Sequence, residues 1–165
     1  MDRSPVMNIN ELDYTDWGNG EAFQARLGLL SQQLGARKLG YRVVVLPAGK
    51  KAWPYHAHYV NEEMFFILDG TGTLRFEGKE FALKAGDVIA CPAEPDKPHQ
   101  IVNTSNKELK YLAVSTMEHP EVAHYPDSNK LGVMVGGAPG VAQTQRKYFL
   151  FPEKASGIDY WEGES

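Results

Sequence analysis

Two histidines, His56 and His58, stand two residues apart in the sequence. In an extended strand, residues i and i+2 project from the same face, about 6.6 Å apart along the chain, so both imidazoles can reach one ion. A carboxylate follows at Glu62 or Glu63, just before the apolar segment 64–68, where a turn can bring it back to that ion. We predict a metal site made of imidazole nitrogen and carboxylate oxygen.

A third histidine, His99, lies much further along the chain, and Ile101 and Asn103 share its strand face. A closed antiparallel barrel would bring this second strand alongside the first. Imidazole and carboxylate ligands suit Zn, Mn, Fe, Co or Ni and do not distinguish among these metals. The single cysteine, Cys91, lies in an apolar strand with no activating positive charge, so we expect a buried core residue and no thiolate ligand.

The first group of residues resembles a sequence motif of the cupin superfamily. The pattern His56-x-His58-x4-Glu63-x6-Gly70 is similar to the first cupin motif, with the preceding glycine, Gly49, one residue further away than usual. Alternation alone does not choose between Glu62 and Glu63, because both faces of the strand that follows are apolar. The family spacing to Gly70 makes Glu63 the implied ligand and leaves Glu62 as a candidate at the rim of the site or behind the ligands.

The second group resembles most of the second cupin motif. Gly86-x5-Pro92 is followed by His99-x3-Asn103, although the segment before His99 is two residues longer than usual and lacks a glycine. The resemblance covers about residues 41–115. It implies a double-stranded β-helix, or jelly roll, that holds one divalent transition metal per chain on its three histidines and glutamate. Asn103 and the aromatic Tyr55 are further candidates for the pocket.

Short apolar segments separated by turn residues predict an all-β sandwich or barrel. The predicted strands are 41–46, 64–68, 73–76, 80–83, 88–91, 109–115 and 147–151. Segment 23–34 fits both helical and strand periodicity, and we favour a strand. The glycine-rich segment 132–140 is predicted to be a surface loop, and 125–130 a turn, with a lid over the barrel mouth as the alternative. We expect His119 and His124 to be exposed.

The length of 165 residues predicts one domain. We expect an N-terminal extension at 1–40, a core barrel with both motifs at 41–117 and a C-terminal extension at 118–165, both extensions packing on the barrel. Segment 64–68 lacks alternation, which predicts a strand buried on both faces. One face would look into the barrel and the other onto a second sheet or a partner subunit, so we predict a homodimer.

Charge and cysteine usage exclude several classes of function. The formal charge is −4 with scattered basic residues, so a nucleic-acid partner is not expected. No apolar run approaches the roughly 20 residues that span a bilayer, so no membrane partner is expected. One cysteine and no signal peptide predict a cytoplasmic location.

Four protein ligands on an ion that prefers six leave two open positions for a small-molecule ligand. We therefore expect a mononuclear metalloenzyme acting on a small oxygen-rich substrate. Isomerisation of a sugar or sugar phosphate stands slightly ahead of the oxidoreductase and decarboxylase chemistries also found in the family. No clustered Arg or Lys set marks a phosphate pocket. The alternatives are a non-catalytic binding protein that holds its ligand through the metal, as sensor or carrier, and an empty structural barrel.

Overall fold

The computed structural model describes residues 4–137, 147–154, 157 and 159–163. Strands dominate it, with one short α-helix, α1 (Ser31–Leu34), and one 3-10 turn, η1 (Pro126–Ser128). The strands are β1 (Tyr14–Asn19), β2 (Phe23–Leu29), β3 (Leu39–Leu46), β4 (Ala57–His58), β5 (Glu63–Asp69), β6 (Thr71–Phe76), β7 (Lys79–Lys84), β8 (Val88–Cys91), β9 (His99–Val102), β10 (Leu109–Thr116), β11 (Glu121–Tyr125), β12 (Lys130–Val135) and β13 (Tyr148–Leu150). No helix in the described part of the chain is long and apolar enough to cross a bilayer.

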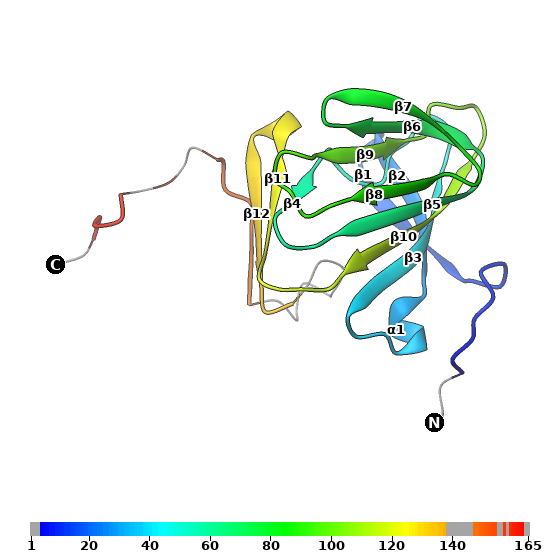
Figure 1. The fold of residues 1–165 in the computed structure, drawn as a ribbon, viewed down its shortest axis with the longest axis horizontal. Coiled ribbons are helices and arrows are strands. Elements are labelled where there is room, and N and C mark those ends of the chain that lie inside the picture. Colours follow the sequence, from blue (N-terminus) through cyan, green and yellow to red (C-terminus); the bar gives the residue numbers. More distant parts are fainter. Residues whose placement is uncertain (1–3, 138–146, 155–156, 158, 164–165) are drawn as a thin grey trace.

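Two sheets enclose one hydrophobic core. The larger has the order β1-β2-β3-β10-β5-β8, and the smaller has the order β7-β6-β9. Leu46, Ile67 and Tyr111 from the first sheet pack in one cluster with Leu74 and Ile101 from the second. In Figure 1 the strands β7, β6 and β9 lie above β8, β5 and β10 of the larger sheet in this view. The chain is therefore a jelly-roll barrel, as predicted.

A third sheet, with the order β13-β12-β11-β4, adjoins the barrel through its histidine segment. Strand β11 pairs antiparallel with β4, with Ala123 opposite His58 and His124 opposite Ala57. Figure 1 shows the β11–β12 hairpin at one side of the barrel, next to β4. At the other end of the sequence, β2 pairs antiparallel with β3 and thereby extends the larger sheet.

The turn from β5 into β6 explains one motif glycine. Gly70 has φ +85°, a left-handed conformation that L side chains rarely adopt. A Cβ at this position would also collide with the backbone carbonyl of Glu108. Gly70 thus lets the chain turn closely against the start of β10.

All seven predicted strands are present, as β3, β5, β6, β7, β8, β10 and β13. Segment 23–34 contains both of its competing patterns in succession, because the strand β2 ends at Leu29 and the short helix α1 follows. The turn at 125–130 is confirmed by η1 and by Asn129 in a left-handed conformation. Cys91 is buried, as predicted, with 1% of its surface exposed.

Three local predictions are corrected. Residues 132–135 of the predicted loop belong to β12, because that segment pairs with β11 on one side and β13 on the other; 138–140 lie outside the described residues. His119 is exposed, but His124 is half-buried. Strand β5 is not buried on both faces within one chain, because Met64 is 36% exposed while Phe65 is 6% exposed. The homodimer inferred from that strand stays a prediction.

Candidate metal centre

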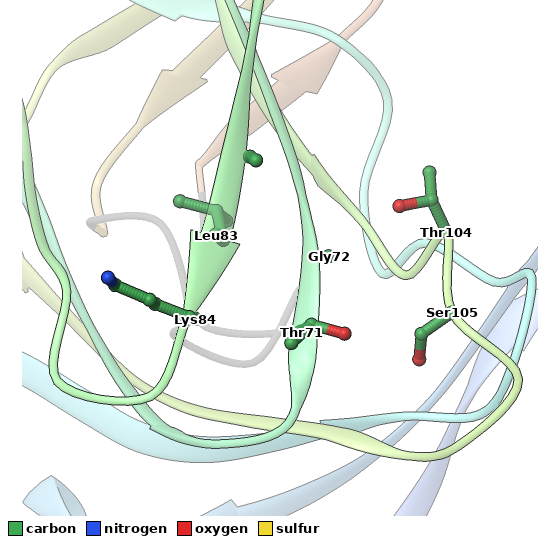
Figure 2. Close-up of a pocket in the computed structure, with 7 residues that line it drawn as sticks. Thr71, Gly72, Leu83, Lys84, Thr104 and Ser105 are labelled. Atoms are coloured by element: carbon green, nitrogen blue, oxygen red, sulfur yellow. The ribbon is translucent and has the colours of Figure 1, made fainter.

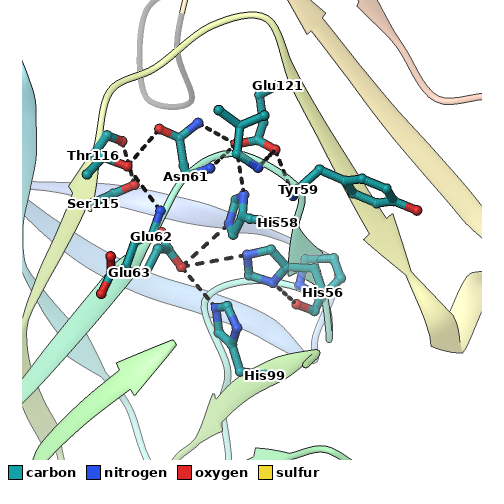
Figure 3. Close-up of polar contacts among 12 residues, drawn as sticks. His56, His58, Tyr59, Asn61, Glu62, Glu63, His99, Ser115, Thr116 and Glu121 are labelled. Atoms are coloured by element: carbon teal, nitrogen blue, oxygen red, sulfur yellow. Dashed lines mark hydrogen bonds and ion pairs between the residues drawn. The ribbon is translucent and has the colours of Figure 1, made fainter. Parts of the chain in front are cut away.

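Three separate segments bring the predicted metal ligands together. His56 and His99 form an antiparallel bridge, in which each backbone N–H donates to the other's carbonyl. His58 follows in β4, and Glu63 is the first residue of β5. Figure 3 shows the three imidazoles converging on the Glu63 carboxylate.

The ligand atoms have the separations of a mononuclear site. Oε2 of Glu63 lies 2.9 Å from Nε2 of His99, 3.6 Å from Nε2 of His58 and 4.0 Å from Nε2 of His56. One ligand atom from each of the four residues lies within 4.8 Å of all the others. Ligands about 2.1 Å from a metal are about 3 to 4 Å apart. The three distances from Glu63 are close to this range, and the widest pairs would draw together on a bound ion. The cluster therefore has the size and the donor types of a site for one divalent transition metal.

Buried atoms without a partner support the same conclusion. Both ring nitrogens of His58 and Nδ1 of His99 are buried and make no hydrogen bond among the described residues. Buried polar atoms are nearly always paired, so each such atom needs an explanation. A metal on Nε2 of His58 would satisfy one of them.

The ionisation of the cluster reflects its burial. Burial and the neighbouring imidazoles of His99 and His58 lower the pKa of His56 to about 3, so this ring is neutral, as metal binding requires. Burial alone would lower the pKa of His58 too, but the carboxylates of Glu63 and Glu121 outweigh it and raise the pKa to about 10. The Glu63 pKa stays well below its usual range because His58 and His99 outweigh its burial. A metal must therefore displace the proton on His58.

The other candidates from the sequence make contacts outside the ligand cluster. Glu62 is exposed, and its backbone N–H donates to Oγ1 of Thr116. Tyr55 is buried, and its hydroxyl accepts a hydrogen bond from the backbone N–H of Gly78. Asn103 donates to the carbonyls of Leu46, Pro47 and Lys107, so it fixes backbone at its own turn. None of the three lines the cavity at the cluster.

The four ligands open into a cavity of about 770 Å³. Its walls come from the barrel, from Trp17 of β1, and from the C-terminal strands through Tyr125, Met134 and Phe149. The ring of Tyr125 stacks on His56 with centroids 5.9 Å apart. The C-terminal strands therefore form one wall of the cavity beside the metal ligands.

Two cationic side chains line this cavity. Arg42 and Lys130 are far apart in the sequence but share the cavity. The guanidinium of Arg42 lies over the Trp53 ring, 5.7 Å from its centroid, and makes no ion pair with any described residue. Burial lowers the pKa of Arg42, but a guanidinium remains charged in proteins.

Sequence reasoning missed these cations for a structural reason. Arg42 shares strand parity with Val44 and Leu46, which point into the core, and an arginine on an inward face is a signal of function. Tyr41 and Val43 make the other face equally apolar, so alternation could not assign the inward side. Lys130 lies beyond the second motif, and no local pattern places it at the barrel mouth.

A second pocket of about 400 Å³ lies at the other end of β6 from His99. Figure 2 shows Thr71 and Gly72 on β6 facing Thr104 and Ser105 across it. Lys84 is the only charged side chain among the described residues that line it. This pocket lacks the ligands that make the first cavity a candidate site.

Comparison with known proteins agrees with this geometry. Residues 42–115 match the family model described as a cupin domain. An uncharacterized protein of Methanocaldococcus jannaschii is 38% identical over 80 residues, which are 48% of this chain and 59% of that protein. An oxalate-binding protein of Thermotoga maritima is 34% identical over 112 residues, which are 68% of this chain and 89% of that protein.

The fold is shared along nearly the whole chain with a solved structure. A sugar phosphate isomerase of the cupin superfamily from Silicibacter pomeroyi superposes with a TM-score of 0.75 at 22% identity, covering 94% of this chain and 98% of the other. That likeness is one of fold and includes the terminal extensions. With the family model, the Thermotoga relative and the barrel in agreement, the chain belongs to the cupin superfamily.

Proposed function

We propose that this protein is a metal-dependent enzyme acting on a small, oxygen-rich anion, with isomerisation of a sugar phosphate ahead of oxygenation or decarboxylation. The observation that carries the proposal is the shared cavity. His56, His58, Glu63 and His99 would hold the metal. Arg42 lines the same cavity and makes no ion pair with any described carboxylate, although the nearby charge of Glu63 favours its charged form.

The metal and the arginine have separate tasks. A bound divalent metal acts as a Lewis acid that polarises a hydroxyl or carbonyl oxygen. Arg42 would bind the anionic group of the substrate, because a guanidinium pairs with phosphate or carboxylate through two parallel N–H donors. The face of Trp53 limits the orientation of that guanidinium. Substrate would thus be held at two points, with its reacting carbons between them.

Cavity size favours a substrate larger than a simple dicarboxylate. A volume of about 770 Å³ exceeds the needs of oxalate, which has only six heavy atoms, and falls within the range of pockets for larger ligands. The isomerase from Silicibacter pomeroyi shares the fold and both extensions, which accords with this choice. At 22% identity it does not carry the assignment, which rests on Arg42 and the cavity.

An isomerase must also move a proton. Glu63 is the only carboxylate among the described residues that line the cavity, and it belongs to the proposed ligand set. The remaining lining groups that exchange protons include Tyr111 and Lys130. Burial, reinforced by Glu63, raises the pKa of Tyr111, so its phenol stays protonated and can donate a hydrogen bond to a substrate oxygen. Lys130 is the proposed partner for proton exchange.

A second candidate is a binding protein without catalysis. Two observations favour it: the described lining offers no spare carboxylate as a general base, and a relative 34% identical is an oxalate-binding protein. In this case the metal and Arg42 would hold the ligand without turnover. Oxalate is then the first ligand to test.

The deciding experiment compares Arg42→Ala with wild type in metal-loaded protein. Sugar phosphates and the matching free sugars are assayed for isomerisation, and oxalate binding is measured by calorimetry. Loss of a charge-assisted hydrogen bond costs about 1.5 to 3 kcal/mol, so KM for phosphorylated substrates should rise about 10- to 100-fold, with little change for free sugars. Arg26→Ala is the matched control, because Arg26 pairs with Glu108 on the surface.

The outcomes separate the candidates. Turnover of sugar phosphates that depends on Arg42 supports the isomerase. Stoichiometric oxalate binding without turnover of any sugar phosphate supports the binding protein. If metal-loaded protein neither turned over a sugar phosphate nor bound oxalate, both candidate functions would be refuted.

A further inference from the structure

A second carboxylate lies directly behind the metal ligands. Glu121, the first residue of β11, is completely buried, with 0% of its surface exposed. Carboxylates are almost never fully buried unless they are paired, since desolvation of a charge is costly. Glu121 also lies outside the segment 42–115 that matches the cupin model. Its burial therefore needs an explanation particular to the β11–β12 hairpin.

The turn between His58 and Glu63 explains part of the burial of Glu121. One oxygen of Glu121 accepts the backbone N–H groups of Tyr59 and Val60, at 3.1 and 3.3 Å. The other accepts the backbone N–H of Asn61 at 2.8 Å and also its side-chain amide. This single carboxylate therefore holds the three residues that follow His58 and lead towards Glu63, as Figure 3 shows.

Asn61 continues this network into β10. Its side-chain oxygen accepts hydrogen bonds from Oγ1 of Thr116 at 3.0 Å and from the backbone N–H of Glu118 at 2.7 Å. Oγ1 of Thr116 in turn accepts the backbone N–H of Glu62. The turn is thus fastened on two sides, by Glu121 from β11 and by Thr116 from β10.

The imidazole of His58 lies beside the Glu121 carboxylate and explains the rest of its burial. Its Nδ1 lies 3.5 Å from Oε2 of Glu121, and its Nε2 lies 3.6 Å from Oε2 of Glu63. Neither nitrogen makes a hydrogen bond among the described residues, so the ring stands between two carboxylates with unused capacity on both sides. His56 offers a comparison, since its Nδ1 lies 2.8 Å from the carbonyl of Pro54, which leaves Nε2 to face the cluster.

We propose that Glu121 is a positioning residue for the metal site: it accepts the Nδ1 proton of His58, so that Nε2 presents its lone pair to the metal. Hydrogen bonds of this kind set the tautomer and ring orientation of metal-bound histidines, and losing one costs about 10- to 100-fold in metal affinity. The inference rests on the proposed metal binding.

The test measures Zn²⁺ affinity by chelator competition in the full chain. Glu121→Gln keeps the size of the side chain but replaces one acceptor oxygen with a donor amide, so we expect affinity to fall about 10- to 100-fold. Thr116→Val is the matched control, because it loosens the same turn without touching His58. It should lower stability while leaving Zn²⁺ affinity within about threefold of wild type, a change of under about 0.7 kcal/mol.

A measurement on wild type keeps the proposal falsifiable if Glu121→Gln does not fold. Nitrogen-15 spectra of Zn²⁺-loaded protein should show His58 protonated at Nδ1 and bound through Nε2. His58 bound through Nδ1 would overturn the proposal, as would unchanged Zn²⁺ affinity in Glu121→Gln or an equal loss in Thr116→Val. Failure of wild type to bind Zn²⁺, Mn²⁺, Fe²⁺ or Ni²⁺ would instead refute the metal site.

Discussion

At the scale of single residues, the Glu63 carboxylate is the point on which the cluster depends. It lies within 4.0 Å of Nε2 of all three histidines. Burial, and after it the imidazoles of His99 and His58, lower the pKa of His56 to about 3. A divalent metal satisfies the same nitrogens without requiring further protons. The cluster is therefore expected to hold metal in the protein as it is isolated.

We predict that His56→Ala/His58→Ala removes this metal. Wild type, purified without chelator or metal-affinity resin, should contain about one transition metal ion per chain, and the variant close to none, because only two ligands remain. His119→Ala/His124→Ala is the control, since it removes two histidines that lie outside the cluster. Elemental analysis gives the answer, and equal metal contents in wild type and the cluster variant would contradict the site.

The two motifs made most of the cluster predictable from sequence. His56 and His58 lie two residues apart, and that spacing survives in any extended backbone. Arg42 and Glu121 were not predictable, for different reasons. Both faces of the strand around Arg42 are apolar, so alternation cannot tell which face points inward. Glu121 becomes buried only because β11 pairs with β4, which is a contact between distant segments.

At the scale of elements, the tip of the β11–β12 hairpin is fastened to the barrel by an ion pair. Arg75 of β6 donates to both carboxylate oxygens of Asp127 in η1, at 2.9 and 3.2 Å. The same guanidinium donates to Gln100 of β9 and lies 4.2 Å from the centroid of the Tyr55 ring. The hairpin that supplies Glu121 and Tyr125 is thus held at its tip as well as along β4.

We predict that Asp127→Asn loosens this fastening in a pH-dependent way. The hydrogen bond from Arg75 lowers the pKa of Asp127 below its ordinary value of 3.8. A carboxyl group whose pKa is lower in the folded than in the unfolded protein stabilises the fold at pH above its unfolded-state pKa. That contribution is lost as the pH falls through its folded-state pKa. Asp127 is 53% exposed, so the loss at pH 7 should be under about 1 kcal/mol.

Urea unfolding of wild type and Asp127→Asn at pH 7 and at successive steps below pH 4 measures this difference. The two curves should converge at the acid end, because both side chains are then neutral. Asp16→Asn, an exposed carboxylate without an ion pair among the described residues, controls for the loss of one charge. If the difference in unfolding free energy between wild type and Asp127→Asn grew as the pH fell, the prediction would be contradicted.

Strand prediction succeeded where apolar residues and turns were local. It failed at β11 and β12, because Glu121 and His124 look like surface residues and glycines interrupt the second segment. Gly132 has no Cβ and packs against the rings of Tyr125 and Phe151, so here glycine marks close packing within a sheet. Such contacts between distant segments determine the structure there more strongly than local composition does.

At the scale of the whole molecule, the predicted homodimer can be tested on the outer face of β5 and β8. Met64 and Val88 expose 36% and 68% of their surface there. We expect a dimer by light scattering and a monomer for Val88→Asp, because a buried unpaired charge opposes association. Val6→Asp, at an exposed valine of the N-terminal segment, is the control. A monomeric wild type would contradict the prediction.

The tryptophans give the cavity an optical property. Trp17 and Trp53 both line it, with ring centroids 6.4 Å apart, and Trp17 donates its indole N–H to the carbonyl of Ala52. The third tryptophan, Trp161, is 71% exposed near the C-terminus. Replacing Trp161 with phenylalanine leaves the cavity pair as the source of tryptophan emission, which excitation at the red edge of the absorption band selects over tyrosine. Intrinsic fluorescence of that variant then reports cavity occupancy directly, so ligands of unknown identity can be screened without a dye, a label or a coupled assay.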